Sequence, residues 1–166
     1  MLSICRADPF SSESQTLISA LADSLLKLSG NQAVEQFDET EFNHHTGVFL
    51  LVKNQEQAIA CGGFRYLQPG VCEIKRLFSH QAGAGTLVLQ ALEQLAVEFG
   101  YQQINLATRK VNHQAIQFYQ KHGYQTTAPF GLYTRHQHYL SLAKSSQLLA
   151  QAAVPKKAQW HYRNCA

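Results

Sequence analysis

One segment, residues 71–100, constrains the fold more than any other part of the chain. It reads VCEIKRLFSHQAGAGTLVLQALEQLAVEFG. Residues 71–78 predict a strand and the small residues that follow predict a tight turn. Beyond the turn, apolar residues recur with the period of a helix that buries one face: Val88, Ala91, Leu92, Leu95, Ala96 and Phe99. Glu93 and the other polar residues between them are expected to face mostly water, and Gly100 to take the left-handed conformation that ends a helix.

The turn between this strand and helix is a candidate anion site. Residues 82–86, Ala-Gly-Ala-Gly-Thr, carry no bulky side chains, so a ligand could approach the backbone closely. The free N–H groups at a helix start, with the helix dipole behind them, favour a phosphate. A turn of small residues with no ligand is the alternative.

The rest of the chain predicts one mixed α/β domain. A helix is expected after Ser11 or Ser12 and another after Asn112, while residues 31–46 have no clear period. Turn residues between 53 and 70 indicate hairpins, so we expect a mostly antiparallel central sheet of about six to seven strands flanked by helices. The expected strands cover 2–6, 48–52, 58–66, 71–78, 104–109, 124–127 and 139–143. Residues 1–144 form the predicted domain and 145–166 a C-terminal appendage that could pack on a neighbour, which leaves a homodimer open.

Composition excludes several classes of protein. The 166 residues carry a net charge of only +3 without basic runs, which argues against a nucleic-acid-binding protein. No apolar run approaches the roughly 18 residues of a membrane span. The four cysteines, at 5, 61, 72 and 165, lack C-x-x-C spacing. They predict a reduced, cytoplasmic protein in which Cys61 and Cys72 are core residues.

Three motifs together carry a family resemblance. EIKRLF at 73–78 leads to the glycine turn, N-x-x-A-x-x-F-Y-x-x-x-G-Y follows at 112–124, and PFGLY stands at 129–133. In this order the motifs resemble the GNAT superfamily of acyl-coenzyme A-dependent N-acyltransferases, over residues 48–144. The turn departs from the family pattern because His80 occupies the position of a Gln or Arg and the connection is shorter.

The resemblance implies a site for acetyl-CoA or coenzyme A. The pyrophosphate would lie on the N–H groups of the turn, and the pantetheine arm would lie along the end of the preceding strand. Asn112 would contact the arm and Phe118 would line its path. The implied cofactor-binding residues are Leu77, Phe78, Ser79, Ala82, Gly83, Ala84, Gly85, Thr86, Asn112 and Phe118.

An amine that attacks a thioester needs a base for its proton, a donor for the oxyanion and an acid for the leaving thiolate. Tyr119 is the candidate acid, because it lies two helical turns after Asn112 on the same face; a half-buried core tyrosine is the alternative. Glu73 is the candidate base, direct or through water, and shares a strand face with Lys75; an ion pair on a solvated face is the alternative. Arg76 could be a surface charge or a clamp for a substrate carboxylate.

The predicted function is therefore transfer of an acetyl group from acetyl-CoA to a primary amine of a small molecule, by direct attack in a ternary complex. A non-catalytic acyl-CoA-binding module of the same fold is the alternative. A different nucleotide-binding α/β protein would need a purely parallel sheet. The paired histidines at 44–45 and 136–138 lack a third ligand at suitable spacing, so no metal site is predicted.

Overall fold

The computed structural model describes residues 1–30, 38–145, 147 and 163–165. Their strands form one seven-stranded sheet in the order β1-β2-β3-β4-β5-β7-β6. Between neighbouring strands, β4 and β5 pair in parallel and all other pairs are antiparallel. The strands are β1 Leu2–Arg6, β2 Val48–Asn54, β3 Gln57–Gln68, β4 Val71–Ser79, β5 Gln103–Arg109, β6 Gln125–Thr126 and β7 Tyr139–Ser145. The prediction of a mixed, mostly antiparallel sheet flanked by helices is confirmed.

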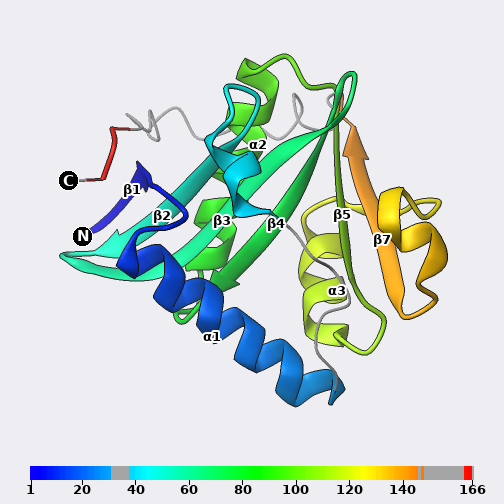
Figure 1. The fold of residues 1–166 in the computed structure, drawn as a ribbon, viewed down its shortest axis with the longest axis horizontal. Coiled ribbons are helices and arrows are strands. Elements are labelled where there is room, and N and C mark those ends of the chain that lie inside the picture. Colours follow the sequence, from blue (N-terminus) through cyan, green and yellow to red (C-terminus); the bar gives the residue numbers. More distant parts are fainter. Residues whose placement is uncertain (31–37, 146, 148–162, 166) are drawn as a thin grey trace.

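Helices cover both faces of this sheet. The helix α1, Ser12–Ser29, crosses one face, and α2, Ala84–Glu98, lies behind the sheet in Figure 1. The third helix, α3, His113–Lys121, shares a hydrophobic core with α2. A smaller core on the α1 face contains Leu17, Phe42 and Phe49. None of the helices in the described ranges combines the length and apolar character needed to cross a bilayer.

The apolar face of α2 is buried as predicted, but one of its polar residues does not face water. The apolar residues Val88, Leu92 and Leu95 are fully buried, and Gly100 has a positive φ of 89°. Glu93, expected to face water, is buried instead. Its carboxylate accepts hydrogen bonds from Lys144 Nζ at 3.1 and 3.2 Å and from the Tyr124 hydroxyl at 3.1 Å. A charged partner on β7 therefore holds Glu93 inside, which periodicity along α2 alone could not reveal.

The strands β4 and β5 separate after a short paired stretch, as Figure 1 shows. They pair only over Val71–Glu73 and Gln103–Asn105. Beyond this point the register of β4 against β3 shifts, and Arg76 takes a positive φ of 61°, which marks a β-bulge. The bulge bends β4 away from β5, so the second halves of the two strands leave space between them.

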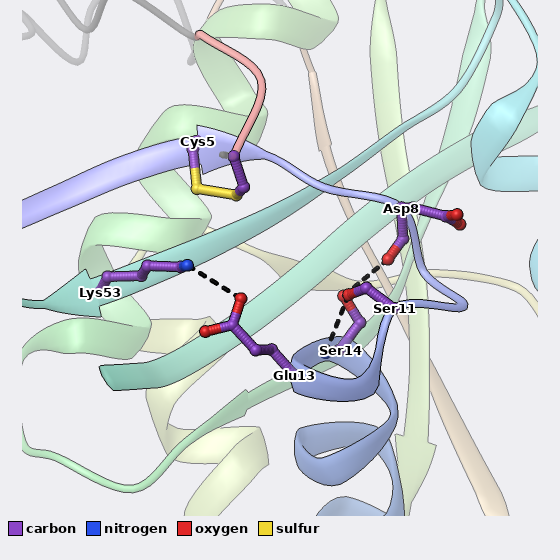
Figure 2. Close-up of a disulfide and its surroundings, with 7 residues drawn as sticks. Cys5, Asp8, Ser11, Glu13, Ser14 and Lys53 are labelled. Carbon is purple, nitrogen blue, oxygen red and sulfur yellow. Dashed lines mark hydrogen bonds and ion pairs between the residues drawn. A yellow bond between two sulfur atoms is a disulfide. The ribbon is translucent and has the colours of Figure 1, made fainter. Parts of the chain in front are cut away.

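A disulfide joins the two ends of the chain. Cys5 on β1 bonds to Cys165, and backbone hydrogen bonds between Arg6 and residues 163 and 165 hold the terminal segment beside β1. Figure 2 shows this bond above the start of α1, where Glu13 pairs with Lys53 at 2.8 Å. The prediction of four reduced cysteines is wrong for this pair, since no local spacing signals a bond between residues 160 positions apart. Cys61 and Cys72 are free and buried, as predicted. The predicted C-terminal appendage, residues 145–166, lies largely outside the described residues.

Removal of this disulfide is expected to lower stability. Closure of so long a loop restricts the unfolded chain, so Cys165→Ser should cost about 2–4 kcal/mol and lower Tm by roughly 5–15 °C. Thermal unfolding with and without a reductant measures the effect. The reductant should lower Tm of the wild type to that of the variant and leave the variant unchanged. An equal Tm in all four samples would contradict a structural role for the bond.

Candidate functional site

Two adjoining hollows lie where β4 and β5 separate. The inner cavity, of about 130 Å³, lies between the diverging strands and is walled by Ile74–Leu77, Leu106–Arg109 and the side chains of Tyr133 and Tyr139. The outer groove, of about 410 Å³, lies between α1, the end of β4 and α3. Six residues line both hollows, so the two are continuous: Leu21, Leu25, Leu77, Asn112, Ala115 and Tyr119.

The outer groove reaches the start of α2. This helix begins after Gly83, at a φ of 86°, and no side chain caps its first N–H groups. A Cβ placed on Gly83 would have no heavy atom within 4 Å, so the approach to the backbone is open. Gly85 lines the groove, and its α-carbon faces Ser79 and Phe118. An uncapped helix start beside an elongated groove fits a ligand with a phosphate at one end.

Tyr119 lies at the junction of the two hollows. Its side chain is buried and packs edge to face on Phe118 and Tyr124, at 5.2 and 5.7 Å between ring centroids. Burial raises the pKa of the Tyr119 hydroxyl, so the group keeps its proton at neutral pH. The tyrosine is thus both a packed core residue and a wall of the cavity.

A buried polar cluster lies at the wall of the inner cavity and consists of Glu73, Lys75 and Tyr133. Lys75 Nζ donates a hydrogen bond to the Tyr133 hydroxyl at 3.0 Å and lies 3.5 Å from Glu73 Oε2. Arg65 binds the other carboxylate oxygen, Oε1, through Nε and Nη2, both at 3.0 Å. Lys75 and Tyr133 line the inner cavity, whereas Glu73, at 1% exposure, lies behind them. The alternative of a Glu73–Lys75 pair on a solvated face is therefore wrong, because both side chains are buried.

Burial shifts the ionisation of this cluster. It lowers the pKa of Lys75 to about 7, with the nearby Arg76 charge as a second cause. Burial also raises the pKa of the Glu73 carboxyl, although the Arg65 charge acts against this. Glu73 Oε2 is fully buried and accepts no hydrogen bond from the described residues. Burial thus favours the uncharged form of both groups, and the two side chains titrate as a coupled pair.

Comparison with known proteins gives the family. The model of the acetyltransferase (GNAT) family matches residues 15–124. The chain belongs to the GNAT family. In fold it is similar to a Klebsiella pneumoniae protein provisionally named an acyl-CoA N-acyltransferase, with a TM-score of 0.72 and 27% identity over 87% of this chain and 97% of that one.

Two further acetyltransferase structures contain a bound cofactor. A GNAT acetyltransferase from Elizabethkingia anophelis has acetyl-CoA bound; its TM-score is 0.63 at 15% identity, over 87% of this chain and 97% of that one. The PaiA N-acetyltransferase of Thermoplasma acidophilum is in complex with coenzyme A, with a TM-score of 0.65 at 16% identity, over 87% and 99%. These likenesses support the fold of this GNAT protein.

A sequence relative is the uncharacterised protein YdhI of Bacillus subtilis strain 168. The two chains are 46% identical over 85 residues, which are 49% of this chain. The match spans 52% of YdhI, about half of its length.

Most of the predicted cofactor-binding residues of this GNAT protein lie along the outer groove. Six of them line it: Leu77, Phe78, Ser79, Gly85, Asn112 and Phe118. The other four, Ala82, Gly83, Ala84 and Thr86, lie in or beside the turn before α2, with Ala84 buried. Asn112 also caps α3, because its Oδ1 accepts a hydrogen bond from the Ala115 N–H at 3.2 Å. His80, which departs from the family pattern, is exposed and packs on Phe78.

Three residues of the site were missed or given no role by the sequence reasoning. Lys75 was considered only as a charge partner, although its period-two spacing from Glu73 was visible. Tyr133 lies 58 positions from Lys75, and no local pattern indicates their contact. His122 has no role in the sequence analysis, yet its Nε2 lies 3.3 Å from Thr86 Oγ1 beside the α2 turn. In the described residues no group of three His, Cys, Asp or Glu side chains could hold a metal ion.

Proposed function

We propose that this GNAT protein transfers an acetyl group from acetyl-CoA to a primary amine of a small molecule, by direct attack in a ternary complex. One observation carries the proposal. The outer groove runs from the uncapped start of α2 to Tyr119, and there it opens into the inner cavity lined by Lys75 and Tyr133. A cofactor and an acceptor can therefore enter from different hollows and meet at one tyrosine.

Residues of the turn and groove would hold acetyl-CoA, which supplies an activated acetyl thioester. The N–H groups of residues 82–86 would bind the pyrophosphate, with the dipole of α2 behind them, although the Ala84 N–H also donates to the Gln81 carbonyl at 3.2 Å. Leu77, Phe118 and the end of β4 enclose the arm. In the described residues β4 does not pair with β5 beyond Glu73, and a backbone N–H near Leu77 would donate to the acetyl oxygen.

Two proton transfers follow from the polar groups at the cavity wall. Neutral Lys75 Nζ accepts the proton of the acceptor ammonium, and the buried carboxylate of Glu73 stabilises the charge that Lys75 gains. Glu73 thus acts through Lys75 rather than by contact with the acceptor. The Tyr119 hydroxyl, kept protonated by burial, delivers a proton to the departing sulfur.

The pH dependence of kcat should report the ionisation of Lys75. Its pKa of about 7 means that the protonated form, which cannot accept a proton, dominates below pH 7. We expect kcat at saturating substrates to fall about tenfold per pH unit below 7 and to level off above it. In Lys75→Gln the residual kcat should lack this fall, the acidic limb of the pH profile. Lys110→Gln, which replaces an exposed lysine, should keep the limb. The same limb in Lys75→Gln would contradict the assignment.

Calorimetric titration with acetyl-CoA and coenzyme A tests the cofactor. No binding at high micromolar concentrations would refute the proposal. Binding without thioester consumption across a panel of amines would instead favour the non-catalytic acyl-CoA-binding module.

Gly85→Glu should weaken this binding. The new side chain would fill the space that faces Ser79 and Phe118 and would place a negative charge at the phosphate site. We expect Kd for coenzyme A to rise at least tenfold. Gln90→Glu adds the same charge on an exposed position of α2 and is expected to leave Kd within about twofold. Equal affinities of Gly85→Glu and wild type would place the phosphate elsewhere.

The cytoplasmic location, the single domain at 1–144 and the homodimer remain predictions. Cell fractionation tests the first, a truncated chain that folds tests the second, and light scattering of the purified protein tests the third.

A further inference from the structure

The inner cavity has a strongly asymmetric charge. Two guanidinium side chains, those of Arg76 and Arg109, belong to its wall, together with Lys75, which the proposed mechanism uses in its neutral form. No carboxylate residue does so within the part of the chain that the structure describes. Glu73 lies behind Lys75 and Glu39 pairs with Arg76, but the residues of the wall itself favour an anionic group over a plain alkylammonium ion.

Arg109 stands at the end of β5, where this strand is farthest from its pairing with β4. Its side chain is 7% exposed, and its guanidinium lies 6.0 Å from the centre of the Tyr139 ring, on the residue directly opposite in β7. Alternation along β5 places Arg109, Ala107 and Asn105 on one face, and Asn105 is paired with Glu73 of β4. The guanidinium is thus on the same side of the sheet as the Glu73–Lys75 cluster.

Ser141 also lies on this face, and its hydroxyl has no hydrogen-bond partner among the described residues. It belongs to β7 and is 3% exposed. It pairs with Ala107, which lines the inner cavity, and it shares a face with Tyr139 two residues earlier. A buried hydroxyl without a partner is costly, and this one lies directly beside the β5 segment that lines the cavity.

Arg76 connects the inner cavity to a further hollow beneath α1. This α1 hollow, of about 380 Å³, is mostly apolar and is lined by Ile18, Leu21, Ala22, Leu25 and Leu26 together with Asp23, Glu39 and Arg76. Arg76 Nε lies 3.5 Å from Glu39 Oε1, a long ion pair at the rim. The bulge at Arg76 therefore places a cation between a small polar cavity and an apolar surface.

From these observations we infer that the acceptor is an amine that carries its own anionic oxygen group, with an apolar amino acid as the best fit. The inference rests on the proposed function. The carboxylate would bind Arg109 and Arg76, because a guanidinium pairs with two carboxylate oxygens at once. The amine would lie at Lys75 and Tyr119, and the side chain would extend into the α1 hollow. A phosphate group has the same chemistry toward arginine, so the test must separate the two.

Matched acceptors test the charge requirement by thioester consumption. Leucine is compared with leucinamide and 3-methylbutylamine, which share its side chain but lack the carboxylate. β-Alanine is compared with O-phosphoethanolamine and ethanolamine, which share a two-carbon amine. We expect kcat/KM of leucine to exceed that of its two uncharged analogues by at least about 100-fold, the value of a charge-assisted pair. The kcat/KM of β-alanine should exceed that of O-phosphoethanolamine and that of ethanolamine. A higher kcat/KM for O-phosphoethanolamine would overturn the carboxylate assignment.

Substitution of Arg109 tests the residue. In Arg109→Gln the advantage of leucine over 3-methylbutylamine should shrink to less than about tenfold, mainly through a higher KM for leucine. Arg109→Lys, which keeps the charge but loses the paired geometry, should fall between this variant and wild type. Lys110→Gln removes a neighbouring exposed charge and should leave the ratio unchanged. Leucine should also raise Tm of the coenzyme A complex of the wild type but not of Arg109→Gln.

The outcomes separate this inference from the proposed function. If 3-methylbutylamine, a polyamine or an aminoglycoside is acetylated better than the amino acids, acetyl transfer stands and the anionic acceptor is refuted. If the ratio is unchanged in Arg109→Gln and Arg76→Gln, the two arginines do not read the carboxylate. If acetyl-CoA does not bind, or binds and no amine is consumed, the proposed function fails and the inference fails with it.

Discussion

Tyr119→Phe is expected to lower kcat by about 100- to 1,000-fold, the usual contribution of a positioned general acid. The hydroxyl is the part of this side chain that can protonate the departing sulfur, and burial keeps its proton in place at neutral pH. The ring remains in the variant, so its packing on Phe118 and Tyr124 and the shape of both hollows should be retained. We therefore expect Kd for coenzyme A to change less than about threefold. Steady-state kinetics and calorimetric titration measure the two quantities.

Tyr124→Phe is the matched control for this substitution. Tyr124 is also buried and contacts Tyr119, but its hydroxyl donates to Glu93 rather than lining a hollow. Loss of that hydrogen bond should cost about 1 kcal/mol of stability and leave kcat within a few-fold. If Tyr119→Phe lowered kcat and coenzyme A affinity equally, Tyr119 would be a packing residue. An equal loss of kcat in Tyr124→Phe would lead to the same conclusion about Tyr119.

The sequence predicted the local parts of this structure well. Periodicity located the buried face of α2, small residues located the turn before it, and Asn112 was correctly expected to cap α3. Each of these features depends on residues within a few positions of one another, where backbone preference and side-chain period act directly. The order of hairpins also sufficed to predict a mixed sheet, although the observed strands are longer at several ends.

Contacts between distant residues were beyond the sequence reasoning. The Cys5–Cys165 bond, the Lys75–Tyr133 hydrogen bond and the Glu93–Lys144 pair each join elements that only the folded sheet brings together. Two of the three bury a charge that a local pattern would place in water. The candidate site was therefore predicted as a set of positions on β4, α2 and α3. The contacts that its charged residues make with Tyr133, before β7, and with Tyr139, on β7, were not predicted.

Glu73→Gln is the second substitution with a large expected effect, because it removes the charge on which Lys75 depends. Lys75 Nζ lies 3.5 Å from Glu73 Oε2, and loss of this anion makes protonation of a buried amine harder. We expect kcat to fall roughly 100-fold and its pH limb to move below pH 7. Arg65 and Lys75 also lose a buried partner, so the free energy of unfolding should fall by about 3–5 kcal/mol and Tm should fall with it. Activity is therefore measured at a temperature where the variant is folded.

Glu41→Gln provides the control that separates chemistry from the loss of an arginine partner. Glu41 Oε2 lies 3.1 Å from the same Arg65, but its side chain is 39% exposed, whereas that of Glu73 is 1% exposed. The same substitution there should leave kcat and its pH limb unchanged and cost less than about 1 kcal/mol. A pH limb that stays near 7 in Glu73→Gln, or an equal loss of kcat in Glu41→Gln, would show that Glu73 supports the fold alone. A limb that moves only in Glu73→Gln is the result that a purely structural carboxylate could not produce, because a packing defect lowers kcat equally at every pH.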